Sequence, residues 1–272
     1  MGLLLKVLIP LLGAALALYF YSAPGNFSEE MLRGKRVIVT GASSGIGEQM
    51  AYHLARMEAH LLLTARTEAK LQKVVERCLE LGAASARYIS GSMDSPSLPE
   101  EVLREAENAW GGLDMLILNH IGQSSFTFFS GDVGHVRKLM ETNFVSYVAL
   151  ATAALPLLKE SEGSIVVVSS IAGELLTQPF LCLPQVPAET PLPKAEEGPQ
   201  AELGLRVSTF WYPLITLTCC SAVISQAGAL RRRELHYPAP AVSSMLLLRS
   251  LAPELLDSLV RSRYRLENVR RT

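Results

Sequence analysis

The architecture of this chain is predicted by one segment, Thr40-Gly41-Ala42-Ser43-Ser44-Gly45-Ile46-Gly47, which directly follows the apolar run Val37-Ile38-Val39. A β-branched run that breaks into a glycine-rich turn and continues with helical periodicity is the sequence form of strand, phosphate-binding loop and helix. Gly41 permits a sharp turn off the strand, Gly45 lets backbone N–H groups approach a pyrophosphate, and Gly47 permits close helix packing on the sheet. The helix N-terminus then faces the negative charge. The segment therefore predicts a dinucleotide-binding site.

Length and composition are those of one large α/β domain. The chain has 272 residues, of which 49% are hydrophobic, and a formal net charge of −1. A core of that size disfavours disorder, and the balanced charge disfavours a nucleic-acid-binding surface. The cysteines have neither disulfide-framework spacing nor metal-ligand pairing with the histidines, so we expect ordinary thiols and no metal site. They are Cys78, Cys182, Cys219 and Cys220.

The other periodic segments alternate between strands and helices, as a Rossmann-type doubly wound parallel sheet requires. Short apolar runs predict buried parallel strands, and apolar residues at helical spacing predict amphipathic helices. We predict strands over residues 61–64, 86–90, 115–118 and 165–168. We predict helices over residues 68–81, 99–110 and 136–158, the last losing its regularity near Pro156.

Arg66 closes the second predicted strand. In this fold an acidic side chain at that position hydrogen-bonds a free ribose 2′-hydroxyl, whereas an arginine accommodates a 2′-phosphate. Arg66 therefore favours NADP(H) over NAD(H). The alternative is an exposed arginine at a strand end that binds no ligand.

The N-terminus is apolar over residues 3–21, except for Lys6, and that apolar run ends in three consecutive aromatic residues. This is close to the ~20 residues that a bilayer span requires. One interpretation is a cleaved signal peptide; the aromatic cluster and the lack of a clear cleavage site favour an uncleaved signal anchor over residues 1–24. Asn26-Phe27-Ser28 matches the N-glycosylation sequon. It lies so close to the apolar segment that we expect Asn26 to carry no glycan.

The loop spacing Gly-x-x-x-Gly-x-Gly resembles the cofactor loop of the short-chain dehydrogenase/reductase family. Residues 31–173 resemble its membrane-anchored 11-beta-hydroxysteroid dehydrogenase branch, through segments such as Ala-Tyr-His-Leu and Gly-Gly-Leu-Asp-Met-Leu-Ile-Leu-Asn-His-Ile. The resemblance implies an NADP(H)-binding region over residues 31–173, a steroid-like substrate, and a lumenal domain anchored in the endoplasmic reticulum membrane. Because that compartment is oxidising, a disulfide between two of the cysteines Cys182, Cys219 and Cys220 remains an open alternative.

The resemblance also implies which residues contact the cofactor. They are Gly41, Ser43, Ser44, Gly45, Ile46, Gly47, Arg66, Thr67, Ser92, Met93, Asn119, His120 and Ile121. Ser44 lacks the second positive charge that steroid-reducing relatives often carry in this loop. His120 stands where most members have asparagine, and we expect it to touch the cofactor through its main chain rather than to act as a base.

Two residues match catalytic positions of the family. Asn143 matches the asparagine that holds a water in the proton relay; inside an apolar helix it would otherwise be a buried polar group in need of a partner. Ser170 matches the serine whose hydroxyl hydrogen-bonds the substrate carbonyl. Tyr147, one turn after Asn143, is expected in the core.

The family pattern fails after Gly173. A tyrosine followed four residues later by a lysine should supply the proton and grip the nicotinamide ribose, but Leu183 and Pro187 stand there, and no tyrosine in the chain has a lysine at that spacing. Residues 174–205 are rich in proline and glutamate and predict an extended or disordered insert. Beyond it, residues 214–220 resemble the family's sixth strand.

The C-terminal region, residues 206–272, adds amphipathic helices with leucines among arginines to that strand. Such a helix suits a membrane surface, a homodimer or an ordinary solvent-facing face.

Three functions remain open for the whole chain. The first is an NADP-dependent hydroxysteroid dehydrogenase that interconverts ketone and alcohol. The second is a cofactor-binding but inactive relative, favoured by the missing tyrosine and lysine. The third is a membrane-anchored interaction protein with a damaged fold, favoured by the proline-rich segment.

Overall fold

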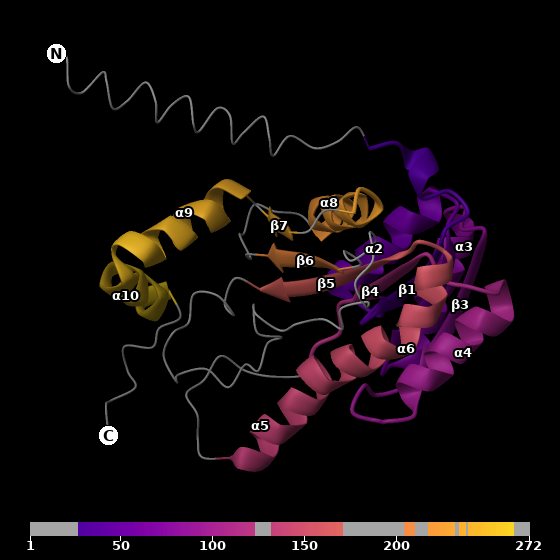
Figure 1. Ribbon diagram of the computed structural model, residues 1–272, viewed down its shortest axis with the longest axis horizontal. Coiled ribbons are helices and arrows are strands. Elements are labelled where there is room, and N and C mark those ends of the chain that lie inside the picture. Colours follow the sequence, from indigo (N-terminus) through magenta and orange to yellow (C-terminus); the bar gives the residue numbers. More distant parts are fainter. Residues whose placement is uncertain are drawn as a thin grey trace.

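The computed structural model describes residues 27–122, 132–170, 204–209, 217–231, 234–237 and 239–263 (Figure 1). After a 3-10 turn, η1 (Glu29–Met31), the described strands form one parallel sheet in the order β3-β2-β1-β4-β5-β6-β7. Their bounds are β1 Arg36–Thr40, β2 His60–Ala65, β3 Ser85–Ser90, β4 Met115–Leu118, β5 Ser164–Ser170, β6 Gly204–Thr209 and β7 Glu234–Tyr237. The described helices are α2 Gly45–Arg56, α3 Glu68–Glu80, α4 Leu98–Trp110, α5 Val133–Met140, α6 Ser146–Glu160, α8 Leu217–Ala229, α9 Ala239–Leu251 and α10 Pro253–Arg263.

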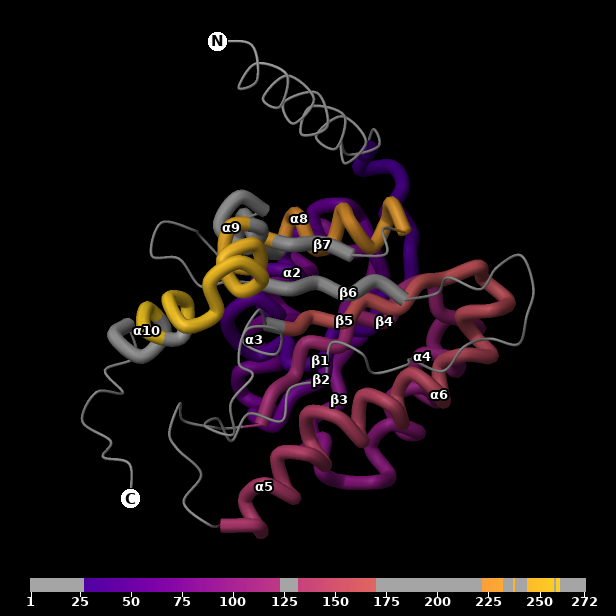
Figure 2. The backbone as a smooth tube through the Cα atoms, turned by 60° about the vertical axis from the view of Figure 1, so that its left-hand side comes forward, coloured from indigo at the N-terminus to yellow at the C-terminus, as the bar shows by residue number. Residues whose placement is uncertain are grey.

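The sheet is covered on both faces, which confirms the predicted doubly wound α/β fold (Figure 2). Successive residues of a strand point to opposite faces, so the run Val37-Ile38-Val39 serves two cores. Val37 and Val39 pack against α2, α3 and α8, while Ile38 packs against α4 and α6. This is why the strand is apolar without alternation.

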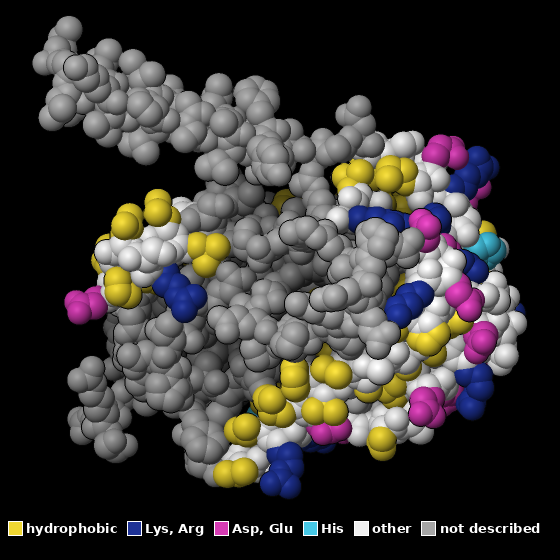
Figure 3. Space-filling view, in the orientation of Figure 1, with side chains coloured by type: hydrophobic (Ala, Val, Ile, Leu, Met, Phe, Trp, Pro, Cys, Tyr) yellow, Lys and Arg dark blue, Asp and Glu magenta, His cyan; other side chains and the backbone are white. Residues whose placement is uncertain are grey.

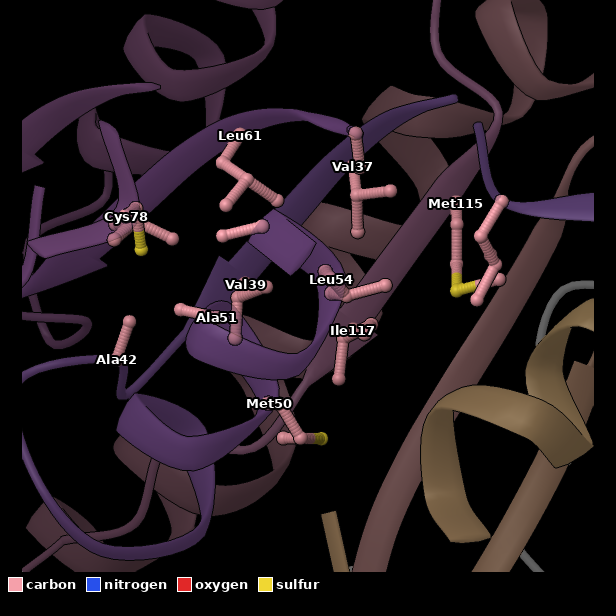
Figure 4. Close-up of a cluster of buried hydrophobic side chains, with 14 of the residues drawn as sticks. Val37, Val39, Ala42, Met50, Ala51, Leu54, Leu61, Cys78, Met115 and Ile117 are labelled. Carbon is pink, nitrogen blue, oxygen red and sulfur yellow. The ribbon is translucent and has the colours of Figure 1, made fainter. Parts of the chain in front are cut away.

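The core between the sheet and α2 is closely packed. Figure 4 shows part of it, with Val39 and Ile117 from the sheet beside Ala51 and Leu54 from α2; all four side chains are fully buried. Cys78 of α3 joins this cluster, and burial raises the pKa of its thiol to about 12. Cys78, expected from the sequence to be an ordinary thiol, is thus a buried packing residue whose thiolate is disfavoured.

The helix predicted over residues 136–158 is longer and less regular than expected. It begins with α5 at Val133, where the Asp132 carboxylate caps it by accepting a 3.0 Å hydrogen bond from the His135 backbone N–H. A π-helical segment, η2 (Glu141–Val145), separates α5 from α6. Pro156 does not end the helix, which continues to Glu160. The three segments form one continuous rod in Figures 1 and 2.

The prediction of a sixth strand over residues 214–220 is wrong. The strand beside β5 is β6, Gly204–Thr209, and residues 217–220 open α8. Helix α8 packs against α2 and β5; a Cβ added at Gly228 would lie 2.8 Å from Val166 Cγ2. A short apolar run fits either a strand or a buried helix, and only its partners decide between them. The predicted insert, residues 174–205, therefore ends inside β6; its residues 174–203 lie outside the described residues, as do residues 1–24.

Within the described segments, no helix combines the length and hydropathy that a bilayer crossing demands. The rod formed by α5, η2 and α6 does carry exposed apolar side chains at Val133, Met140 and Val145. Hydrophobic side chains gather over this part of the surface in Figure 3.

Candidate functional site

A cavity lies at the carboxyl ends of the central strands. Strand β1 has β2 on one side and β4 on the other, so the chain reverses direction across the sheet at this point, where such folds bind ligands. The cavity has a volume of about 1040 Å³, enough for a large organic ligand. It is lined by Gly41, Ser43, Ser44, Ile46, Thr64, Ala65, Arg66, Thr67, Lys70, Gly91, Ser92, Met93, Asp94, Asn119, His120, Ile121, Gly122, His135, Lys138, Leu139 and Thr142.

Eleven of the predicted cofactor residues line this cavity; Gly45 and Gly47 do not. The structure thus brings the glycine loop, the Arg66 region, the Ser92 region and the Asn119 region to one place. Their role as cofactor ligands stays a prediction.

The glycine loop has the backbone geometry expected from its sequence. Gly41 has φ +65°, and a Cβ there would lie 2.9 Å from the Cα of His120. Gly45 has φ +63°, a backbone conformation that favours glycine, and nothing lies within 4 Å of an added Cβ. A Cβ on Gly47 would lie 2.3 Å from the carbonyl oxygen of Gly41. Gly47 therefore acts by letting α2 approach the loop, not by lining the cavity.

Thr40 and Asn119 join the ends of β1 and β4. The Asn119 backbone N–H donates a 2.8 Å hydrogen bond to Thr40 Oγ1, and its side-chain amide donates to the carbonyl oxygens of Thr40 (3.3 Å) and Gly41 (3.4 Å). The Thr40 hydroxyl in turn donates to the carbonyl of Ile117 at 3.2 Å. Asn119 thus holds the glycine loop against β4.

His120 connects the sheet to the long helix. One ring nitrogen, Nδ1, lies 2.8 Å from Thr40 Oγ1, and the other, Nε2, lies 2.8 Å from Ser146 Oγ and 3.1 Å from the Thr142 carbonyl oxygen. Burial lowers the pKa of His120 to about 3, so the ring is neutral. Both nitrogens are engaged, which makes this histidine a structural link rather than a base.

Tyr147 lies in the core, as predicted. Its hydroxyl donates a 2.6 Å hydrogen bond to the carbonyl oxygen of His120, and its ring centroid lies 4.4 Å from that of His120. Burial raises the pKa of this phenol. This tyrosine is therefore committed to packing, and no tyrosine lines the described wall of the cavity.

Asn143 lies in the π-helical segment beside the cavity. Its Oδ1 accepts a 2.6 Å hydrogen bond from the backbone N–H of Gly122. Its Nδ2 is buried and has no partner among the described residues. π-Helical turns frequently occur at functional sites, and a buried amide donor without a partner requires a ligand or water.

Ser170 is the last residue of β5, paired with Thr209 of β6. This position is at the carboxyl edge of the sheet, the same edge as the cavity. Its side chain, and those of Leu183 and Pro187, lie outside the described residues.

Several residues that line the cavity are not predicted by the sequence motifs. Lys138 of α5 forms an ion pair with Asp94 at 3.8 Å. A hydrogen bond from the Ser92 hydroxyl, aided by the charges of Lys138 and Arg66, lowers the pKa of Asp94. Lys70 lies on the first turn of α3, four positions after Arg66. Only the proximity of Lys70 to Arg66 in the sequence could have suggested it.

The residues present fit a dinucleotide. The described wall carries the cations Arg66, Lys70 and Lys138 against the single carboxylate of Asp94, so it favours an anion. Thr64 Oγ1 is fully buried in this wall and has no hydrogen-bond partner among the described residues. In the described part of the chain, no group of three His, Cys, Asp or Glu side chains is arranged to hold a metal ion.

Comparison with known proteins agrees with this geometry. The model of the short chain dehydrogenase family matches residues 35–181. A Danio rerio protein named hydroxysteroid 11-beta-dehydrogenase 1-like protein is 39% identical over 97% of this chain and 99% of its own length. The Gallus gallus protein of that name is 57% identical, but the match covers 57% of this chain and 54% of the relative.

The fold is also similar to those of solved short chain dehydrogenases. A short chain dehydrogenase from Pseudomonas syringae is 30% identical with a TM-score of 0.52, over 56% of this chain and 64% of that one. One from Escherichia coli is 25% identical with a TM-score of 0.53, over 58% and 70%. The likeness to the Danio rerio protein extends past residue 173, farther than the motifs alone reach.

Proposed function

This chain belongs to the short-chain dehydrogenase/reductase family, an oxidoreductase family that binds nicotinamide cofactors, and from that premise we propose that it binds NADP(H) and is of hydroxysteroid dehydrogenase type. One observation carries the choice of cofactor. Arg66 directly follows β2, lines the cavity beside the glycine loop, and occupies the position where an acidic residue would select NAD(H). The names of the relatives support a steroid-like ketone or alcohol as substrate.

The chain's own residues divide the work of binding and orientation. The loop from Gly41 to Ile46 would hold the pyrophosphate of the cofactor, and Arg66 would bind its 2′-phosphate. Asn119, by holding the glycine loop against β4, keeps the strand ends in place around the ligand. The cofactor, when bound, supplies the hydride. Ser170 is expected to hydrogen-bond the substrate carbonyl and Asn143 to hold a water, which suits its unpartnered Nδ2.

We further propose that this chain turns over its substrate slowly. A positioned general acid contributes ~10²- to 10⁴-fold to rate, and no tyrosine with a lysine four residues on exists in the sequence. The inactive, cofactor-binding relative is thus the favoured form of the proposal. The continuous sheet from β3 to β7 argues against the third hypothesis, a damaged fold that binds nothing.

The test combines binding and turnover in one sample. Full-length protein in detergent is titrated with NADPH by fluorescence, and reduction of a steroid ketone is then followed in the same samples. We expect saturable binding with little turnover. Rapid ketone reduction would overturn the proposal of slow turnover, and absence of NADPH binding would overturn the cofactor assignment.

Location and partners stay predictions. We propose anchoring in the endoplasmic reticulum membrane through residues 1–24 with a lumenal domain, because residues 3–21 are apolar and end in an aromatic cluster. We also propose that the chain forms a homodimer through its C-terminal amphipathic helices. Protease protection in microsomes and sedimentation of the purified protein test the two proposals.

A further inference from the structure

Two cations on the cavity wall lie outside the ion pairs formed by the described residues. Arg66 and Lys70 are both exposed and both line the cavity. Neither forms an ion pair with any described carboxylate, although Arg33, Arg36, Arg77, Arg87 and Lys138 each do. Two unneutralised charges on one wall are stabilised when an anion binds between or beside them.

The nearest acid in the sequence is engaged elsewhere. Glu68 accepts a 3.1 Å hydrogen bond from the Tyr88 hydroxyl, which itself accepts a 2.9 Å bond from the Gln72 amide. This cluster joins α3 to β3, and none of its three residues lines the cavity. Glu68 is therefore held away from Lys70, and the wall keeps its positive charge.

The position of Lys70 in its helix is electrostatically unfavourable for a positive charge that binds no anion. It stands in the first turn of α3, where the helix dipole disfavours a positive charge. Leu71, the next residue, is fully buried against the sheet and fixes the rotation of the helix. A lysine whose charge is unfavourable for its own helix, and which lines an anion-favouring cavity, has a reason to be there if an anion binds.

A buried hydroxyl supports a ligand at the same wall. Thr64, two residues before Arg66, is fully buried, lines the cavity, and has no hydrogen-bond partner for Oγ1 among the described residues. Buried polar groups without partners are rare in folded proteins. The glycine loop contributes the hydroxyls of Ser43 and Ser44 to the cavity but no cation. Lys138 lines the cavity from α5 but is paired with Asp94, so the cation near Arg66 that forms no such pair, Lys70, comes from α3.

We propose that Lys70 is a specificity-determining residue, whose ammonium group shares with the Arg66 guanidinium the binding of the 2′-phosphate of NADP(H). This inference rests on the proposed cofactor. Arginine provides planar, bidentate hydrogen bonds to the phosphate oxygens, and lysine adds a point charge from a flexible stem.

The test measures binding of the adenosine half alone, so that turnover plays no part. The probes are adenosine 2′,5′-bisphosphate and adenosine 5′-monophosphate, titrated calorimetrically into the full-length protein. Lys70→Gln is compared with Lys73→Gln, which removes the same charge from the next turn of α3 at an exposed position outside the cavity wall. Arg66→Gln is the second comparison, and Lys70→Arg tests whether charge is what matters.

We expect Lys70→Gln to weaken bisphosphate binding about fivefold, the upper range of an exposed ion pair, and to leave monophosphate binding unchanged. Lys73→Gln should change neither, and Lys70→Arg should restore most of the affinity. Equal effects of Lys70→Gln and Lys73→Gln would overturn the role of Lys70.

The cofactor assignment fails in a different way. If the unaltered protein binds both probes equally, or neither, then the 2′-phosphate site itself is wrong and Lys70 has no role in it. If Arg66→Gln abolishes the preference for the bisphosphate while Lys70→Gln does not affect it, only the role of Lys70 is wrong.

Discussion

At the scale of single residues, the His120 side chain connects the sheet to the long helix. It contacts Thr40 at the end of β1 and Ser146 at the start of α6, and Tyr147 packs against its ring. A residue so placed orients the strand end that leads into the cavity. Because burial keeps it neutral, its protonation opposes folding.

The pH dependence of stability follows from that burial. The pKa of His120 is about 3 in the folded protein and near 6.5 unfolded, so below about pH 6.5 the unfolded chain takes up a proton that the folded chain does not. Stability is therefore lost as pH falls from 6.5 towards 3. His120→Asn, which cannot titrate, should lose about 2 kcal/mol less than the unaltered protein between pH 7 and pH 5. Urea unfolding at the two pH values measures this, and identical pH dependence would contradict it.

At the scale of elements, the rod of α5, η2 and α6 supplies one wall of the site. Leu139 and Thr142 line the cavity from this rod, and the π-helical turn holds Asn143 where it reaches the Gly122 backbone. A regular α-helix places residues at 3.6 per turn, so the π-turn changes which side chains face the sheet after it.

Removing the Asn143 side chain tests this contact. Asn143→Ala leaves the Gly122 N–H without its acceptor, so we expect a loss of about 1–2 kcal/mol in the free energy of unfolding and faster hydrogen exchange at the Gly122 amide. Glu141→Ala is the control, because Glu141 belongs to the same π-helical turn but has an exposed side chain that does not line the cavity. Unchanged exchange at Gly122 in Asn143→Ala would show that this hydrogen bond does not hold the loop.

At the scale of the whole molecule, the site edge and the opposite edge of the sheet have separate tasks. Asp114, just before β4, ties the starts of three strands. Its carboxylate accepts from the Arg36 backbone N–H (2.9 Å) and side chain (2.7 Å), and its carbonyl oxygen accepts from the Ser164 N–H (2.9 Å). Burial alone would raise the pKa of Asp114, but the Arg36 hydrogen bonds and the charges of Arg36 and Lys35 outweigh it and lower the pKa.

We predict that this edge affects stability and not binding. Asp114→Ala should lose about 2 kcal/mol in the free energy of unfolding, while the dissociation constant for NADPH stays the same. Glu105→Ala, which breaks the more exposed Arg87–Glu105 pair, should cost less than about 1 kcal/mol. Urea unfolding and NADPH titration measure both quantities. A large change in NADPH affinity for Asp114→Ala would mean that the two edges are coupled.

Much of the fold and of the site follows from local sequence. The glycine loop needs a positive φ at Gly41 and the close approach at Gly47, and the sequence supplies glycine at both. Uninterrupted apolar runs predict the buried strands β1, β2, β4 and β5, because strands covered on both faces need no polar side. The absence of a tyrosine followed four residues later by a lysine is also read directly from the sequence and does not depend on the fold.

The rest was decided by contacts between distant segments. Residues 217–220 are helical because α8 packs on α2, and Gly204–Thr209 is a strand because β5 offers it an open edge. Lys70 joins Arg66 on one wall because Leu71 is buried and Glu68 is bound to Tyr88. Periodicity reports only the neighbours of a residue along the chain, whereas burial and hydrogen bonding depend on what packs against it. The chemistry of the cofactor loop is therefore written in the sequence, and the composition of the cavity wall around it is a property of the tertiary structure.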